Sequence, residues 1–174
     1  AIIGRAAGTT GRAAFAVYPN PRIDGIEIDP KIVEVGQEFF DMNQENLNVI
    51  VQDGRWAMQT STKQYDIISV DAYRPPYIPW HMTTREFFQI LHDRLKENGV
   101  MVINIGRGPE DRRLINSLAT TIHTIFPNLY ITDLSDSFNS ILFATKNETA
   151  LNNFLDNYYV LSQDSSTPVF LLEV

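Results

Sequence analysis

The sequence predicts an α/β protein with three layers, in which a seven-stranded, mostly parallel sheet lies between helices and carries an antiparallel hairpin at one edge. Short apolar runs alternate with segments of helical period, which is the pattern of a parallel sheet. Only residues 135–138 separate the last two apolar runs, so we expect those strands to pair as a hairpin. With 174 residues, the chain is long enough for about one domain with a single core.

The predicted elements follow one another in a regular order. The expected strands are Ala1–Ile3, Arg22–Ile28, Leu47–Val51, Tyr65–Asp71, Val100–Ile105, Leu129–Leu134 and Ser140–Ala144. The expected helices are Thr10–Tyr18, Pro30–Phe40, Gly54–Met58, Thr84–Leu95, Glu110–Phe126 and Ala150–Tyr159. Asp29 precedes a proline and is expected to cap a helix, as is Thr83 or Thr84. Asn98 and Gly99 are expected to end the helix that begins at residue 84.

The domain organisation follows from where this alternation weakens. We expect residues 1–146 to form a cofactor-binding catalytic domain and residues 147–174 to form a C-terminal extension packed on the same domain. Residues 2–4 read as the last residues of a buried strand that leads into a glycine loop. We therefore expect further residues upstream of the sequence.

Composition excludes several classes of function. The 21 acidic residues exceed the 14 basic ones, and the net charge of −7 repels a phosphate backbone and attracts cationic small molecules, so nucleic acid is not an expected partner. The chain has no cysteine, which excludes disulfides and thiolate chemistry and fits a cytoplasmic location. Apolar runs such as Val100–Ile105 are too short to cross a membrane. Histidine pairs at helical spacing and acidic calcium loops are absent, so no metal is expected.

The ends of the predicted parallel strands carry the candidate binding residues, because ligands of such sheets bind beyond the carboxyl ends of the strands. Gly4 and Gly8 lie between the first strand and its helix, where a ligand can approach the backbone, although an ordinary tight turn is the alternative. Glu27 lies 23 positions after Gly4, the spacing at which nucleotide-binding folds place a carboxylate on ribose hydroxyls. The alternative for Glu27 is a solvated acid at a strand end.

Two further strand ends carry acidic residues. Asp53 and Gly54 follow the third strand, where a carboxylate can accept from an adenine amine, although a turn or a helix cap explains the pair equally well. Asp71 ends the fourth strand and opens a loop rich in proline and aromatic residues, which suits an active-site wall or a subunit contact. His81 in this loop is a candidate base, but a structural role is favoured because the sequence shows no acid that would orient it.

Several of these motifs together resemble the spermidine synthase-like (polyamine aminopropyltransferase) family, which has the Rossmann-like fold of S-adenosylmethionine-dependent methyltransferases. The segments that match it in order and spacing are EIDPKIVEVGQEFF, VQDGR, the strand that ends in Asp71, and TTREFFQILHDRLKENGVMVIN. LSQDSSTPV near the end is similar to the tail of this family, although Phe170 stands where glutamate is usual. The resemblance runs from the glycine loop through Ala144, about four fifths of the chain.

The resemblance implies a site and a reaction. Glu27 would hold the ribose hydroxyls, Asp53 the adenine amine, and Gly4, Gly8 and Gly54 would let the cofactor approach. Asp71 would face the amine nucleophile as its base, with Tyr73 orienting it. The implied cofactor is S-adenosylmethionine or its decarboxylated form, with methylthioadenosine as the product of aminopropyl transfer. The implied partners are a small-molecule substrate such as a polyamine and a second copy of the chain in a homodimer.

The chain also departs from the family pattern at Arg74 and in the glycine loop, and these departures keep two alternatives open. Arg74 stands where the family usually has a second aspartate, and residues 5–10 lack the acid that favours the decarboxylated cofactor. The acid-free loop permits a methyltransferase that uses intact S-adenosylmethionine. Arg5 and Arg74 also permit a non-catalytic nucleoside-binding or dimerisation domain, in which the loop around Trp80 is a contact surface. We expect exposed aromatic groups around Tyr77, Ile78 and Trp80, which favour the homodimer.

Overall fold

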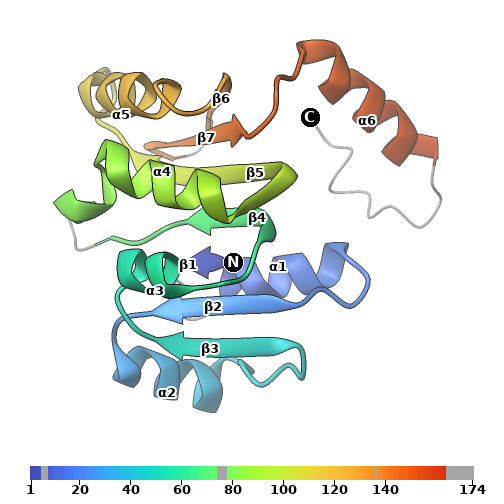
Figure 1. The fold of residues 1–174 in the computed structure, drawn as a ribbon. Coiled ribbons are helices and arrows are strands. Elements are labelled where there is room, and N and C mark those ends of the chain that lie inside the picture. The colour runs from blue at the N-terminus through green and yellow to red at the C-terminus, as the bar shows by residue number, and fades with distance from the viewer. Residues whose placement is uncertain (5–7, 74–77, 136, 164–174) are drawn as a thin grey trace.

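The computed structural model describes residues 1–4, 8–73, 78–135 and 137–163 and confirms the predicted fold class (Figure 1). Its sheet has seven strands in the order β3-β2-β1-β4-β5-β7-β6. The strands are β1 (Ile2–Ile3), β2 (Ile23–Glu27), β3 (Leu47–Val51), β4 (Tyr65–Val70), β5 (Leu95–Gly106), β6 (Asn128–Asp133) and β7 (Asn139–Thr145). The helices are α1 (Thr9–Val17), α2 (Pro30–Phe39), α3 (Gly54–Thr60), the 3₁₀ helix η1 (Trp80–Met82), α4 (Arg85–Arg94), α5 (Arg113–His123) and α6 (Leu151–Gln163).

Strands β1 to β5 run parallel to one another, whereas β7 pairs antiparallel with both β5 and β6. The predicted edge hairpin is therefore present. Helices α3, α4 and α5 cover one face of the sheet and α1 lies behind it (Figure 1). The strand order reverses between β1 and β4, and the carboxyl ends of the parallel strands meet at one edge, at the left of Figure 1. Ligands bind at this position in open parallel sheets.

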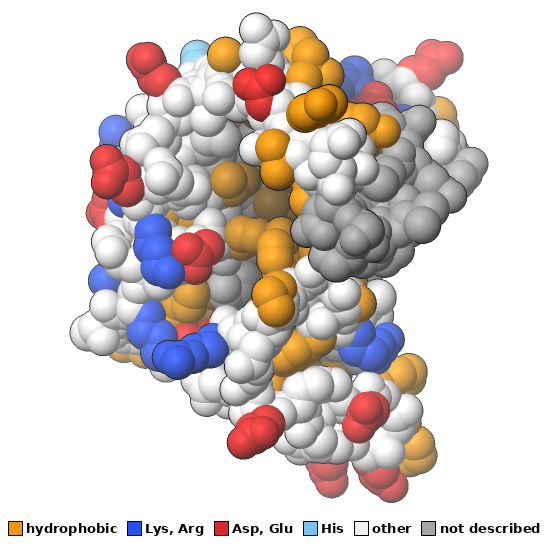
Figure 2. All heavy atoms as spheres, turned by 90° about the vertical axis from the view of Figure 1, so that its right-hand side faces the viewer, with side chains coloured by type: hydrophobic (Ala, Val, Ile, Leu, Met, Phe, Trp, Pro, Cys, Tyr) orange, Lys and Arg blue, Asp and Glu red, His pale blue; other side chains and the backbone are white. Residues whose placement is uncertain are grey.

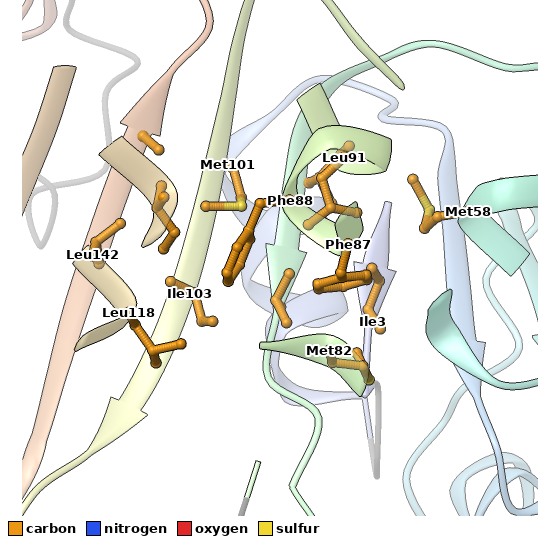
Figure 3. Packing of buried hydrophobic residues seen from close by; sticks show 14 of the residues in the cluster. Ile3, Met58, Met82, Phe87, Phe88, Leu91, Met101, Ile103, Leu118 and Leu142 are labelled. Atoms are coloured by element: carbon orange, nitrogen blue, oxygen red, sulfur yellow. The ribbon is translucent and has the colours of Figure 1, made fainter. Parts of the chain in front are cut away.

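The core lies between the sheet and the layer formed by α3, α4 and α5. Helix α4 contributes Phe87, Phe88 and Leu91, which are completely buried, and Figure 3 shows them between residues of the strands and of η1. Met101 and Ile103 of β5 belong to the same cluster. Because this one continuous core runs beneath η1 and the strand ends, it fixes the backbone from which the candidate site residues project.

The prediction that Asn98 and Gly99 end a helix is wrong. Helix α4 ends at Arg94, and Leu95, which is completely buried, already has an extended backbone and begins β5. Leu95 pairs with Tyr65, whereas Val100 pairs with Ile67, so the register of β5 on β4 shifts between these pairs. Burial of Leu95 in the core therefore places the start of the strand before the Asn-Gly pair, which lies within it.

The last two helices also differ from their predicted bounds. Helix α5 is shorter than expected at both ends, and beyond it the amides of Ile125 and Phe126 bond to the carbonyl of Ile122, which closes a final turn. Helix α6 is longer than expected, and none of its residues is buried.

Figure 2 views the edge of the sheet opposite the carboxyl ends and shows hydrophobic side chains gathered near its top, at the height of α6.

Packing of residues 147–174 on the domain stays a prediction, because residues 164–174 lie outside the described part of the chain. Among the described residues, no helix combines the length and the apolar character needed to span a bilayer.

Candidate active site at the carboxyl edge of the sheet

The register of the three central strands brings the candidate residues to one level. Ile3 of β1 pairs with Ile26 of β2 on one side and with Val70 of β4 on the other. The residues that follow these three are Gly4, Glu27 and Asp71, so they leave the sheet at the same height. Strand β1, although only two residues long, therefore places the predicted ribose-binding acid and the predicted base on either side of the glycine loop.

Gly4 is required by the close approach of the strand ends. Its φ is 80°, and a Cβ atom at this position would lie 2.4 Å from the carbonyl oxygen of Asp71. Its amide donates to the carbonyl oxygen of Ile26 at 3.0 Å, and the Asp71 amide donates to the carbonyl oxygen of Ile3 at 2.8 Å. The backbone at Gly4 is therefore tied to β2 and lies against the end of β4.

Gly8 begins helix α1 with a φ of 85° and supplies no side chain to cap it. The first turn of α1 carries no acidic residue, so no carboxylate in that turn opposes the partial positive charge of the helix N-terminus. Arg5, which the sequence analysis singled out in the glycine loop, lies outside the described residues.

Glu27 is buried, with 7% of its surface exposed, which is inconsistent with a solvated acid at a strand end. Its Oε1 accepts from the amide of Asp29 at 3.2 Å. Asp29 itself caps α2 by accepting from the amide of Lys31 at 2.8 Å, which confirms its predicted role as a cap. A buried carboxylate is stable only with hydrogen-bond donors around it, and a ribose diol supplies two donors of this kind.

Asp53 is held at both carboxylate oxygens. Oδ1 accepts from the amide of Trp56 at 3.0 Å and caps α3, as one of the two interpretations of this residue predicted. Oδ2 lies 2.8 Å from Nε2 of His81. Burial of Asp53 acts to raise its pKa, but hydrogen bonds from the Trp56 amide and His81 outweigh it and hold the pKa below its ordinary value. Asp53 is therefore charged at neutral pH, and each oxygen keeps a lone pair for a further donor.

The contact with Asp53 corrects the sequence-based view of His81, which found no acid near it. The two residues lie 28 positions apart in the chain, so no local motif joins them. Gly54, next to Asp53, has a packing role: a Cβ atom there would lie 2.3 Å from Cγ2 of Ile3. It lets the start of α3 approach β1, and its predicted contact with a cofactor stays a prediction.

Asp71 is held by Asn104 of β5. The side-chain amide of Asn104 donates to Oδ1 of Asp71 at 3.0 Å, while Oδ1 of Asn104 is buried and accepts no hydrogen bond from the described residues. The Tyr73 hydroxyl donates to the backbone oxygen of Asn104 at 2.8 Å and accepts from the amide of Gly106 at 2.6 Å. Asn104 therefore holds Asp71 directly, and Tyr73 fixes the strand that carries Asn104. The orientation of Asp71 by Tyr73 stays a prediction.

A cavity of about 380 Å³ lies beside this group, and its lining is Tyr73, Gly106, Arg107, Gly108, Asp111, Leu114 and Phe138. Asp111 is its one carboxylate, and hydrogen bonds from the side chain and amide of Arg113 lower the pKa of Asp111 to about 2. The cavity therefore presents Asp111 as the partner of Arg113, together with the cationic side chain of Arg107, near the outer end of β5.

The loop after β4 is only partly exposed. Ile78 is buried in the core cluster, so the expectation that it belongs to an exposed surface is wrong, whereas 78% of the surface of Trp80 is exposed. Arg74 and Tyr77 lie outside the described residues.

Within the described part of the chain, no three histidine, aspartate or glutamate side chains come together as a metal site would require.

Comparison with known proteins places these features in context. Residues 2–157 match the spermine/spermidine synthase domain. The chain is 36% identical over 148 residues to a protein of Bifidobacterium longum named "Probable polyamine aminopropyl transferase", and the match covers 83% of this chain and 33% of that protein. A polyamine aminopropyltransferase of Vibrio vulnificus is 29% identical over 133 residues, which cover 74% of this chain and 44% of that protein. The chain thus spans less than half the length of these relatives.

The fold is also similar to solved structures. Human methyltransferase-like protein 13, crystallised in complex with SAH, has a TM-score of 0.80 and 24% sequence identity, over 93% of this chain and 79% of that one. With identity this low, the likeness concerns the fold.

Replacing Tyr73 by phenylalanine removes the hydroxyl that joins Asn104 to Gly106, and we expect it to lower the free energy of unfolding by about 1–3 kcal/mol near neutral pH. Burial raises the pKa of Tyr73, the Gly106 amide lowers it, and Asp71 raises it further, with a net rise. The neutral phenol therefore stabilises the fold fully below the ordinary tyrosine pKa of about 10, and this stabilisation is lost as pH rises through the higher folded pKa.

The free energy of unfolding, measured with urea, should accordingly differ more between the parent and Tyr73→Phe at about pH 8 than at about pH 10.5. Tyr18→Phe is the control, because Tyr18 is half exposed at the end of α1. If Tyr73→Phe and Tyr18→Phe changed the free energy of unfolding by equal amounts at both pH values, the assigned role of the Tyr73 hydroxyl would be contradicted.

Proposed function

The chain belongs to the spermine/spermidine synthase domain family, and we propose that it binds an adenosyl-sulfonium cofactor at the carboxyl edge of its sheet and transfers an aminopropyl group to an amine. The observation that carries this proposal is the register of β1 between β2 and β4. It places Glu27, Gly4 and Asp71 at the same height along the strands. It provides a buried acid for the ribose and a second acid for the nucleophile on opposite sides of Gly4.

The proposed cofactor lies across the ends of β1, β2 and β3. Glu27 accepts from the two ribose hydroxyls, and Asp53 accepts from the exocyclic amine of adenine. Gly8, at the start of α1, presents no side chain to the sulfonium, whereas Gly4 lets the end of β1 lie against the end of β4. Strands β2 and β3 pair in register up to Glu27 and Val51, so the two acids follow neighbouring strand ends, as the ribose and base of one nucleoside require.

Asp71 is the proposed base. The amine nitrogen attacks the carbon next to the sulfonium, the carbon–sulfur bond breaks, its electron pair returns to sulfur, and methylthioadenosine leaves as a neutral thioether. The amine loses its proton to Asp71, which Asn104 holds in place. Two positive centres must meet in this reaction, and the carboxylate of Asp71 lowers their repulsion in the transition state.

The proposed acceptor is a small amine, and a polyamine fits the chemistry. The relative from Bifidobacterium longum carries the name of a polyamine aminopropyl transferase. The cavity beside Tyr73 supports an acceptor pocket by its position, because Tyr73 bonds to the backbone of Asn104, which holds Asp71.

Methyl transfer from intact S-adenosylmethionine is the second candidate function, favoured by the absence of an acid in the first turn of α1. The carboxylate of the intact cofactor is stabilised near helix N-terminal amides. We also propose a cytoplasmic homodimer, for which the exposed Trp80 next to the site provides an apolar contact.

Adenosyl binding should depend on Glu27. We expect Glu27→Ala to bind methylthioadenosine at least about tenfold more weakly than the parent, because charge-assisted hydrogen bonds to two hydroxyls contribute about 1.5–3 kcal/mol each before water compensates. Isothermal titration calorimetry measures the affinity. Glu38→Ala on α2 is the matched control, since Glu38 is exposed. Equal affinity in Glu27→Ala and the parent would remove Glu27 from the site.

The charge of the glycine loop predicts which cofactor is accepted. No acid lies between Gly4 and Gly11, and Arg5 adds a positive charge, so the chain should bind S-adenosylmethionine at least as tightly as its decarboxylated form. A loop aspartate supplying ~1–3 kcal/mol of selectivity would be worth roughly tenfold to hundredfold in preference, and this chain lacks it. Titration of both compounds in one buffer decides between the two candidate functions: a clear preference for the decarboxylated form would contradict this prediction and favour aminopropyl transfer over methyl transfer.

Asp71 should affect the rate of aminopropyl transfer and not the affinity for methylthioadenosine. Asp71→Asn keeps the shape of the side chain but removes the proton acceptor, so aminopropyl transfer should fall by at least about a hundredfold while methylthioadenosine affinity stays within about twofold. Asp66→Asn on the same strand is the control, because Asp66 is exposed and pairs with Lys96. A transfer rate in Asp71→Asn equal to that of the parent would exclude Asp71 as the base.

A further inference from the structure

His81 makes a contact with Asp53 that the helix cap does not require. Oδ1 of Asp53 alone accepts from the Trp56 amide and completes the cap of α3. The second contact, 2.8 Å from His81 Nε2 to Oδ2, fixes the other oxygen. Two donors at the two oxygens stop rotation of the carboxylate about its last bond, whereas the cap alone would leave the orientation of Oδ2 less restricted.

The backbone of His81 is itself held in place from two sides. Met82, the next residue, is buried and points into the core cluster with Phe87 and Ile3 (Figure 3). The guanidinium Nη1 of Arg55 donates to the carbonyl oxygen of His81 at 2.8 Å and to Oγ1 of Thr84 at 3.2 Å. Helix η1 is thus joined to both α3 and the start of α4, so the imidazole reaches Asp53 from a fixed position.

The pair is also accessible to a ligand. About a third of each side chain is exposed, 31% for His81 and 33% for Asp53, and both lie at the carboxyl edge of the sheet. The carboxylate accepts hydrogen bonds and donates none, so Nε2 of His81 must carry the proton in this contact. The side chain of Asp53 is therefore presented to the site as an acceptor of set direction.

We propose that His81 is a positioning residue, which fixes Asp53 so that the site selects a purine with an amine at position 6 over one with a carbonyl oxygen there. The inference rests on the proposed adenosyl site. An adenine amine donates to the fixed carboxylate, whereas a 6-oxo purine brings an oxygen with lone pairs against it. A carboxylate free to turn away from that oxygen discriminates less, because rotation relieves the repulsion.

The experiment compares two ligands, methylthioadenosine and its 6-oxo analogue, by calorimetry with the full chain. The ratio of their affinities is the readout, because a merely structural role of His81 would change both affinities alike. We expect His81→Ala to lower this ratio by at least about fivefold. His81→Gln should restore it to within about twofold of the parent, because the glutamine amide nitrogen can donate from the same position as Nε2.

A double-mutant cycle connects the effect to Asp53. In the background of Asp53→Ala, the further change His81→Ala should leave the ratio within about twofold, since nothing remains for the histidine to position. His92→Ala is the matched control: His92 also lies near an aspartate, Asp93, but on α4 against the ring of Phe126. It should leave the ratio unchanged.

Three outcomes would overturn the proposal. An unchanged ratio in His81→Ala, or an equal loss of both affinities, removes His81 as a positioning residue while the adenosyl site stands. If His81→Ala lowers the affinity ratio just as much in the Asp53→Ala background, His81 acts without Asp53. Failure of the parent chain to bind methylthioadenosine overturns the proposed function, and this inference falls with it.

Discussion

The pairing of a two-residue strand with both of its neighbours is the constraint on which the site depends. Ile3 pairs with Ile26 and Val70, and the three chains leave the sheet together at Gly4, Glu27 and Asp71. The approach is so close that a side chain at Gly4 would collide with the backbone of Asp71. Shifting β1 by one residue would bury the wrong side chains and separate the two acids from the glycine.

Each acid at this edge is held by a different partner, and the differences fit different tasks. Glu27 is buried and accepts from the Asp29 amide. Asp53 is bound at both oxygens, and hydrogen bonds keep its pKa low. Asp71 has a side-chain amide for a partner, that of Asn104. The proposed site seats a cationic sulfonium beside an amine, which requires several carboxylates in fixed directions, and these hydrogen bonds fix them.

The sequence was sufficient to predict the strands and the acids at their ends, because these depend on local pattern. It did not reveal that Asp53 meets His81 or that Asp71 meets Asn104, since 28 and 33 residues separate these pairs and only the packing of the strands and η1 brings them together. The start of β5 at Leu95 was missed for a related reason: a local Asn-Gly signal was outweighed by burial of Leu95 in the core.

The central claim is that one nucleoside lies across the ends of β2 and β3, with its sulfur toward Asp71. A crystal structure of the chain with methylthioadenosine tests it most directly. The account predicts the ribose hydroxyls within hydrogen-bond distance of Glu27, the adenine amine beside Asp53, and the contact of Asp53 with His81 unchanged. A nucleoside bound at another edge of the sheet, or with its ribose away from Glu27, would contradict the account.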